Sequence, residues 1–260
     1  ELADGRYLEA DLVLGCDGRQ SLLRRQADLE LVEQGERLEL LWFELPGPLP
    51  AAVDGGFSTH LRNGAIGSAC VGAGGAWQLA WLLNPPQPTP QRSTLQWAEQ
   101  LARLLPEPLG RLLQERAGEL QGPVKLGVQV GLARQWRRPG LLLLGDAAHP
   151  MSPVRAQGIN MALRDSLVAA HWLSRSKAED LDAAAVAVER QRRPEIQRMQ
   201  QLQSAEARQG ALIGHNALLR SLLAQATPLL GPLASRVWQG RQAPLREGLA
   251  GALPAATLLA

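Results

Sequence analysis

Cysteine, lysine and long apolar runs are scarce in this chain of 260 residues. The two cysteines, Cys16 and Cys70, are too few for a disulfide framework or a structural zinc site, so we expect a reducing, cytoplasmic location and no bound metal. No apolar run reaches the roughly 18–20 residues that cross a bilayer. Lysine occurs only at positions 125 and 177, and the net charge of +2 is too small to predict a nucleic-acid partner.

The first residues also lack the features of a natural N-terminus. The chain opens without methionine, and residues 1–11 are acidic with no apolar core, which excludes a signal peptide. We therefore expect the chain to be a fragment of a longer protein.

The order of strand and helix patterns predicts an α/β (α+β) fold. Two short apolar runs, Leu12–Gly15 and Leu141–Leu144, are typical of strands buried on both faces. Between them, runs bounded by Gly and Pro across residues 38–84 indicate antiparallel sheet, with a hairpin turn at residues 72–75. We expect a partial nucleotide-binding, Rossmann-like domain (1–37 and 124–200), an inserted β-sheet substrate domain (38–123) and C-terminal helices (201–260) interrupted at prolines.

The first run of candidate site residues follows the Leu12–Gly15 strand. It reads Asp17-Gly18-Arg19-Gln20-Ser21-Leu22-Leu23-Arg24, with Ser21 as the expected helix cap. A strand that opens into a helix presents free N–H groups suited to phosphate, and Asp17 can accept hydrogen bonds from ribose or ribityl hydroxyls. The alternative is an ordinary acidic turn followed by a cap.

The second run follows the Leu141–Leu144 strand and is more specific. It reads Gly145-Asp146-Ala147-Ala148-His149, then Pro153, then Gly158-Ile159-Asn160. Gly145 permits a sharp turn at the strand's carboxyl end, where open α/β sheets bind ligands, and Asp146 would face that crevice. The small Ala147 allows close approach of a cofactor. A helix from Gly158 would turn its positive N-terminus toward a reduced flavin, which carries negative charge.

Together the two runs resemble the D-G-x-x-S-x-x-R and G-D-A-A-H…P…G-x-N motifs of flavoprotein aromatic hydroxylases, the group of p-hydroxybenzoate and ubiquinone-biosynthesis hydroxylases. The resemblance implies FAD as cofactor and NADPH or NADH as co-substrate. It implies that Asp146 contacts the ribityl chain and that Gly158–Asn160 cradle the isoalloxazine. It also places Asp17 and Gly18, with Arg24 in the same motif, near the pyrophosphate.

The chain departs from that family pattern at two places. The family has a glycine near the position of Arg155, so either the loop differs here or Arg155 points toward the substrate or an anion. The family's N-terminal G-x-G-x-x-G unit is also missing, and we expect the isolated fragment to bind FAD poorly and to be inactive.

Several other residues have two interpretations. His149 could titrate in catalysis, but the resemblance favours a scaffold role beside the cofactor. Trp77 and Trp81 share a strand face and could line an aromatic pocket, although sheet packing is favoured. Leu218, Leu219, Leu222 and Leu223 could touch a membrane or a partner helix, although core packing is favoured.

The sequence thus predicts an FAD-dependent monooxygenase that hydroxylates an aromatic or quinol ring with NAD(P)H and O2. The rivals are another FAD enzyme of the same fold, such as a prenyl-lipid reductase or a halogenase, and a non-catalytic fragment. A small aromatic or quinol substrate, a weak peripheral membrane contact and a homodimer are the expected partners, and no catalytic acid or base can be named.

Overall fold

The computed structural model describes residues 4–35, 38–49, 56–62, 65–83, 88–249 and 252–253. Its contacts divide the chain into two compact units. Unit 1 comprises residues 1–36, 129–207 and 232–260, and unit 2 comprises residues 37–128 and 208–231. Unit 2 is therefore formed by two insertions in unit 1, one of residues 37–128 and a second of residues 208–231.

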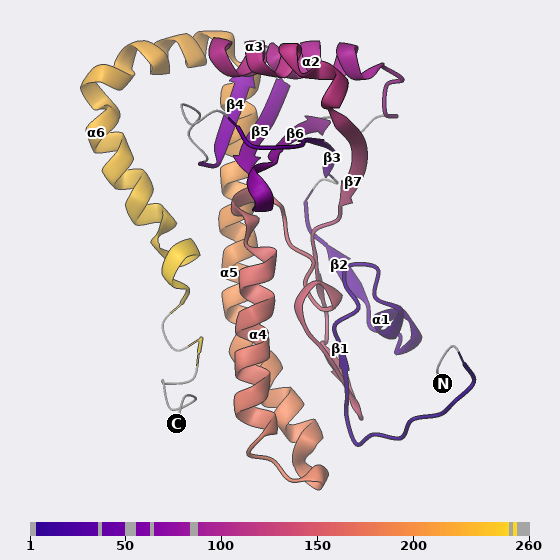
Figure 1. Ribbon diagram of the computed structural model, residues 1–260. Coiled ribbons are helices and arrows are strands. Elements are labelled where there is room, and N and C mark those ends of the chain that lie inside the picture. The colour runs from indigo at the N-terminus through magenta and orange to yellow at the C-terminus, as the bar shows by residue number, and fades with distance from the viewer. Residues whose placement is uncertain are drawn as a thin grey trace. The chain divides into compact units, whose positions relative to one another are not determined.

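Unit 1 is built on short strands and long helices (Figure 1). Its strands are β1 (Val13–Gly15), β2 (Leu31–Glu33), β8 (Gly131–Ala133), β9 (Arg137–Arg138) and β10 (Leu141–Leu143). Its helices are α1 (Leu22–Gln26), α4 (Gly158–Leu173), residues 181–207 of α5 (Leu181–His215) and residues 232–247 of α6 (Ala217–Glu247). Short 3-10 turns occur at Gly145–Ala147, Val154–Ala156 and Ala178–Asp180.

The two strands predicted to be buried on both faces are neighbours, but only β10 is buried. Val13 and Leu14 of β1 are 43% and 44% exposed, because among the described residues no strand pairs with the other side of β1. β1 pairs in parallel with β10, and β9 adds an antiparallel strand on the other side of β10. All three leucines of β10 are buried, as their unbroken apolar run predicts, in a core with Trp136, Val168 and Ile196. Parallel pairing brings the carboxyl ends of β1 and β10 to the same edge, so the segments that follow them start side by side.

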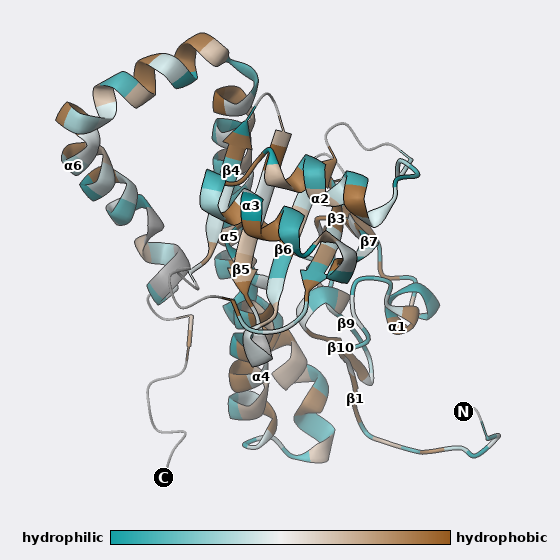
Figure 2. Ribbon diagram, turned by 45° about the horizontal axis from the view of Figure 1, so that its top comes forward, coloured by the Kyte–Doolittle hydropathy of each residue, from teal (hydrophilic) through white to brown (hydrophobic). Residues whose placement is uncertain are grey.

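Unit 2 is a five-stranded antiparallel sheet with strand order β4-β5-β6-β3-β7. The strands are β3 (Leu38–Leu45), β4 (Ser58–Arg62), β5 (Ala65–Val71), β6 (Trp77–Leu83) and β7 (Gln121–Val128). Two helices, α2 (Thr94–Ala102) and α3 (Glu107–Glu115), lie over the sheet in Figure 2, with 3-10 turns at Ala73–Gly75 and Ala117–Glu119. The turn expected at residues 72–75 joins β5 to β6.

Alternation along each strand gives this sheet two different faces. One face packs on α2 and α3 and contains Leu41, Phe43 and Leu79, all at most 1% exposed. The opposite face carries Trp42, which stands directly across from Ala80 on β6 and Val124 on β7. The helix-covered face is thus the core of unit 2, and the Trp42 face is the open one.

The expected border after residue 123 does not match the strand pairing. β7 runs to Val128 and pairs with β3, so residues 124–128 belong to the sheet of unit 2. The pairing of β7 with β3 depends on contacts between distant segments, and no local pattern specifies those.

The prolines of the C-terminal helices do not interrupt them as predicted. α5 runs through Pro194, and α6 (Ala217–Glu247) runs through Pro228, Pro232 and Pro244, so the break falls at Asn216 instead. Proline removes one helical hydrogen bond and disfavours a helix interior. In α5, packing of Ile196 and Met199 into the core outweighs that cost.

Candidate flavin site

The loop after β10 turns sharply at Gly145, within unit 1. Gly145 has a φ of 58°, and a Cβ atom there would lie 3.0 Å from the Cβ of Ala162 on α4. Both the left-handed backbone and the close approach of α4 therefore require glycine. The turn carries the next residue, Asp146, out of the core at the carboxyl end of β10.

The Asp146 carboxylate lies beside the first residue of α4, as the sequence predicted. A Cβ atom built on Gly158 would be 3.7 Å from Asp146 Oδ1, which is ordinary contact and shows how near the carboxylate lies to the start of the helix. The Asp146 side chain is 28% exposed, and its Oδ2 lies 3.4 Å from Arg19 Nη2. In the described chain no side chain caps the first turn of α4. Its N–H groups are thus free to bind an outside acceptor.

The Asp17 carboxylate is used within its own segment. Asp17 Oδ2 accepts hydrogen bonds from the Leu22 N–H at 2.7 Å and the Leu23 N–H at 3.1 Å, and Ser21 Oγ accepts from the Arg24 N–H. Partial burial raises the pKa of Asp17, but the hydrogen bonds from Ser21 and these N–H groups outweigh it and lower the pKa. The N–H groups expected to bind phosphate are therefore occupied, although Ser21 caps α1 as predicted.

Arg24 joins the two motifs. Its guanidinium donates to the Ala147 carbonyl at 2.7 Å and to the Arg19 carbonyl at 2.8 Å, and the residue is only 6% exposed. A planar, forked donor suits two carbonyls held apart in this way. Arg24 thus fixes the backbone of both motifs relative to each other and has little surface left for a ligand.

The loop residues divide into exposed and buried ones. Pro153, Ile159 and Asn160 are exposed around the start of α4, where a cofactor could reach them. Ala147 has no exposed surface and packs in the core of unit 1. Close approach of a cofactor to Ala147, expected from its small size, stays a prediction, and in this structure the side chain itself is covered by the core.

A buried cluster of charges lies under the Gly145 turn, and the sequence did not predict it. Asp165 Oδ2 accepts from the Gly145 N–H at 3.0 Å and lies 2.5 Å from His149 Nε2, while Asp165 Oδ1 accepts from Arg192 Nε at 2.8 Å. Arg192 also pairs with Glu195. The sequence shows only that Asp165 follows His149 by 16 residues and that Arg192 and Glu195 lie one helical turn apart further on.

The cluster keeps its carboxylates ionised. Burial raises the pKa of Asp165, but His149 and Arg192 outweigh burial and lower it. Burial likewise raises the pKa of Glu195, and hydrogen bonds from Arg164 and Arg192 lower it further than burial raises it. His149 is fully buried and stacks on Trp136 with ring centroids 4.9 Å apart. These contacts support a scaffold role for His149.

The Arg155 side chain points toward an anion, one of the expected outcomes, while the loop keeps the turn that a glycine would make. It has a φ of 64°, the left-handed value that a glycine would adopt without strain, so the loop keeps the glycine-type turn. Its guanidinium pairs with Glu206 at 2.5 Å and lies 4.4 Å from the centre of the Trp238 ring. The anion that Arg155 meets is therefore a side chain of α5.

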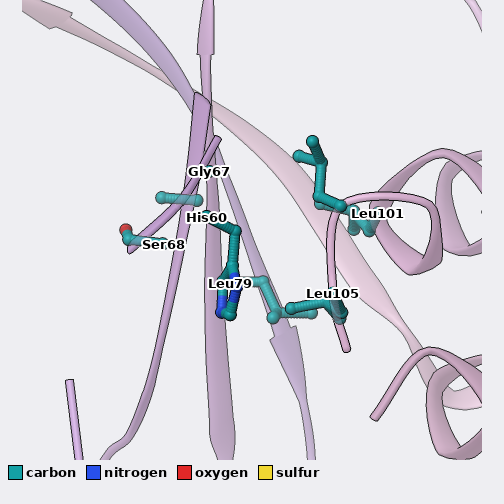
Figure 3. A pocket seen from close by; sticks show the side chains of 8 residues that line it. His60, Gly67, Ser68, Leu79, Leu101 and Leu105 are labelled. Atoms are coloured by element: carbon teal, nitrogen blue, oxygen red, sulfur yellow. The ribbon is translucent and has the colours of Figure 1, made fainter. Parts of the chain in front are cut away.

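In unit 2, the two tryptophans expected on one strand face lie on the helix-covered side. Trp77 is 2% exposed and belongs to the core, which confirms sheet packing for this residue, with Trp81 packed against that core. Figure 3 shows His60, Leu79 and Leu101 around a cavity of about 10 Å³ on this side. That volume holds about one water and excludes an aromatic ring.

The open face of the same sheet presents the larger apolar surface. Val124 is 56% exposed, Leu126 is 40% exposed, and Trp42 stands opposite Val124. The alternation of the strand does not show which face the helices cover, so the sequence gives no sign that Trp42 lies on the open face. Within unit 2, Gly214 of α5 lies close to Leu61 on β4 and Ile66 on β5, at the far edge of this face.

Known proteins share the sequence and the fold. Residues 2–201 match the family model described as FAD binding domain. A 6-methylpretetramide 4-monooxygenase from Streptomyces rimosus is 31% identical over 253 residues, 92% of this chain and 58% of that protein. A ubiquinone hydroxylase from Rhodospirillum rubrum is 31% identical over 252 residues, 89% of this chain and 54% of that protein. The chain thus spans little more than half of these relatives.

A solved structure agrees with the expected mixed α/β fold. Klebsiella pneumoniae HpxO, determined with FAD and uric acid, superimposes with a TM-score of 0.65 at 20% identity, covering 92% of this chain and 60% of that one. At this identity the likeness shows the fold. The family-model match and the two monooxygenase relatives confirm the resemblance stated from the motifs. The chain belongs to the FAD binding domain family, and its relatives include a monooxygenase and a ubiquinone hydroxylase.

Proposed function

We propose that this chain is part of an FAD-dependent monooxygenase that hydroxylates an aromatic or quinol ring with NAD(P)H and O2. The observation that carries the proposal is the position of the Asp146 carboxylate beside the uncapped start of α4. FAD, when bound, supplies the redox chemistry, taking electrons from NAD(P)H and activating O2. The relatives that act on pretetramide and ubiquinone support a polycyclic or quinol substrate.

Three residues of this chain would hold the flavin. Asp146 would accept a hydrogen bond from a ribityl hydroxyl through its partly exposed carboxylate, which also lies 3.4 Å from Arg19 Nη2. Asn160 would bind the pyrimidine edge of the ring. Gly158 starts a helix of 16 residues, whose dipole stabilises negative charge in front of its N-terminus. The residues present therefore fit a flavin.

The substrate would contact the open face of the sheet in unit 2. Trp42, Val124 and Leu126 offer an apolar, partly aromatic surface of the kind that buries a flat ring and excludes water. The small cavity on the opposite face is too small for that purpose.

Asp146 gives the direct test in the longest natural reading frame that contains this chain. Asp146→Ala should release FAD during gel filtration, while Asp180→Ala, an exposed carboxylate on another turn, should retain it. Retention of FAD by Asp146→Ala would argue against this site.

Oxygen consumption separates the proposed hydroxylase from its rivals. A hydroxylase consumes O2 and NAD(P)H when an aromatic or quinol substrate is added. A prenyl-lipid reductase would oxidise NAD(P)H without substrate-dependent oxygen uptake, and a halogenase would require halide. A protein that neither retains FAD nor oxidises NAD(P)H would be the non-catalytic alternative.

We also propose a weak peripheral membrane contact through the part of α6 that belongs to unit 2. Leu218, Leu222 and Leu229 fall on one side of that helix and are 78%, 64% and 85% exposed. No helix among the described residues is long and apolar enough to span a bilayer, so such a contact would lie on the surface. Core packing was expected for Leu218, Leu219, Leu222 and Leu223. It is wrong for Leu218, Leu222 and Leu223, which are exposed, whereas Leu219 is half-buried.

A further inference from the structure

The loop between Pro150 and Gln157 has few hydrogen bonds of its own. Val154–Ala156 form a single 3-10 turn, and Arg155 and Ala156 both have positive φ values. The loop nevertheless has to present Pro153 and the start of α4 in one fixed arrangement if a flavin is to bind there. The Pro153 and Arg155 carbonyls accept hydrogen bonds within the loop, whereas the Ser152 and Val154 carbonyls need partners from elsewhere in unit 1.

Gln203 of α5 supplies two of these partners. Its Nε2 donates to the Ser152 carbonyl at 3.0 Å and to the Val154 carbonyl at 2.7 Å, so the two bonds bracket Pro153. The Gln203 side chain has no exposed surface. Because carbonyls only accept hydrogen bonds, the amide nitrogen must face them, and the orientation of this side chain is determined by chemistry.

Gln200, one turn earlier on α5, repeats the arrangement at the start of the loop. Its Nε2 donates to the Gly131 carbonyl at 2.7 Å and lies 3.5 Å from the Pro150 carbonyl, and the residue is 1% exposed. Two turns before Gln200 on α5, Arg192 donates a hydrogen bond to Asp165, which in turn accepts one from the Gly145 N–H. At 100° per residue these three α5 side chains share one side of the helix over roughly 16 Å.

Figure 1 shows α4 and α5 running alongside each other, and the pair of Arg164 with Glu195 at 2.7 Å joins them. The side of α5 that faces the loop thus carries buried polar side chains at the positions where a core helix would normally carry apolar ones. Each buried amide loses solvation on folding, which is offset only by the carbonyls that it binds.

We propose that α5 positions the flavin-binding loop, with Gln203 and Gln200 as positioning residues that hold Pro153 and the start of α4 in place. The inference rests on the proposed function, because it assigns these residues a role in FAD binding. They touch the loop backbone and not the cofactor. The alternative is that they only stabilise the fold.

Gln203→Met tests the inference, since methionine keeps the volume of the side chain and removes both donated bonds. Gln191→Met is the matched control. Gln191 lies on the same helix and accepts a hydrogen bond from Trp172 Nε1 at 2.8 Å, away from the loop. Both variants would be made in the longest natural reading frame that contains this chain, and FAD itself is the probe.

We expect Gln203→Met to weaken FAD binding about tenfold, because it removes two hydrogen bonds that each contribute a modest net free energy to the loop arrangement. The absorption spectrum of the bound flavin should change as well. Gln191→Met should leave the FAD dissociation constant and spectrum unchanged at a comparable loss of unfolding midpoint. Wild-type affinity and spectrum in Gln203→Met would overturn the inference, and so would equal weakening in both variants.

Hydrogen exchange separates this inference from the proposed function. Amides of residues 152–158 should exchange faster in Gln203→Met than in wild type or Gln191→Met, with or without FAD. Unchanged exchange there would overturn the positioning role even if FAD binds. Faster exchange in a protein whose wild type rejects FAD would instead overturn the proposed function, and with it the role of the loop in binding FAD.

Discussion

Asp165 Oδ2 lies 2.5 Å from His149 Nε2, and both side chains are fully buried. The same oxygen accepts the Gly145 N–H, so one carboxylate oxygen binds both ends of the turn that carries Asp146. This carboxylate therefore determines how rigidly the candidate flavin site is held, although it is not exposed to a ligand.

Replacing this carboxylate should destabilise the protein strongly. In Asp165→Asn, one side-chain atom becomes an N–H donor and must face either Arg192 or the Gly145 N–H, so one buried bond is lost. We expect a loss of about 3–5 kcal/mol in the free energy of unfolding, as for a broken buried ion pair. Urea denaturation at pH 7 measures it. Asp180→Asn, at an exposed position, should change it by less than about 0.5 kcal/mol.

The same cluster predicts sensitivity to acid. The pKa values of Asp165 and Glu195 lie below their ordinary values of 3.8 and 4.5, so folding favours the ionised forms. Their contribution to stability is complete above those ordinary values and is lost as the pH falls through the lower, folded-state pKa values. Urea midpoints between pH 7 and pH 3 should therefore fall more steeply in wild type than in Asp165→Asn. Parallel curves would contradict this assignment.

Arg155 separates backbone strain from side-chain contact. Alanine at this position would lose the Glu206 pair and the Trp238 contact while keeping the strained φ of 64°. Glycine would lose the same contacts and relieve the strain. We expect Arg155→Gly to be more stable than Arg155→Ala by about 1 kcal/mol, measured by chemical denaturation. An alanine variant as stable as the glycine variant would mean that the loop adopts another conformation.

Much of the site could be predicted because its chemistry is local. Gly145 is specified by its left-handed turn and the close approach of α4, and a fully apolar run of leucines is specific for a buried strand. The position of Asp146 beside Gly158 follows once the strand and the helix are placed. The mixed α/β fold and the flavoprotein family were predictable for the same reason.

What the sequence could not show depends on distant partners. The charge on Asp165 is compensated by Arg192, which lies 27 residues further on, and no local pattern links the two. Gln203 looks like a surface residue of a helix until the loop carbonyls are placed against it. Similarly, the sequence does not distinguish the helix-covered face of the sheet from the open face. An aromatic pocket was therefore considered at Trp77, which lies in the core, and not at Trp42, which lies on the open face.

Asp17 provides a test of how its own segment is held. Asp17→Ala would leave the Leu22 and Leu23 N–H groups without their acceptor, and we expect a loss of about 1 kcal/mol in the free energy of unfolding. Asp17→Asn keeps an acceptor oxygen and should restore most of the loss. Equal destabilisation by both variants would show that the negative charge, and not the hydrogen bonds, matters.

Vesicle sedimentation tests the exposed leucines of α6. A helix whose apolar side enters the interface should lose binding when that side becomes charged, because each glutamate opposes insertion and is repelled by anionic lipid. The double variant Leu222→Glu, Leu229→Glu should sediment several-fold less with phosphatidylglycerol-containing vesicles than wild type.

The double variant Ala224→Glu, Thr227→Glu is the control. It adds the same charge at exposed positions on the opposite side of the helix, and it should retain most of the binding. Equal loss in both would mean that net charge alone controls adsorption, and no binding by wild type would remove the membrane contact from the proposed function.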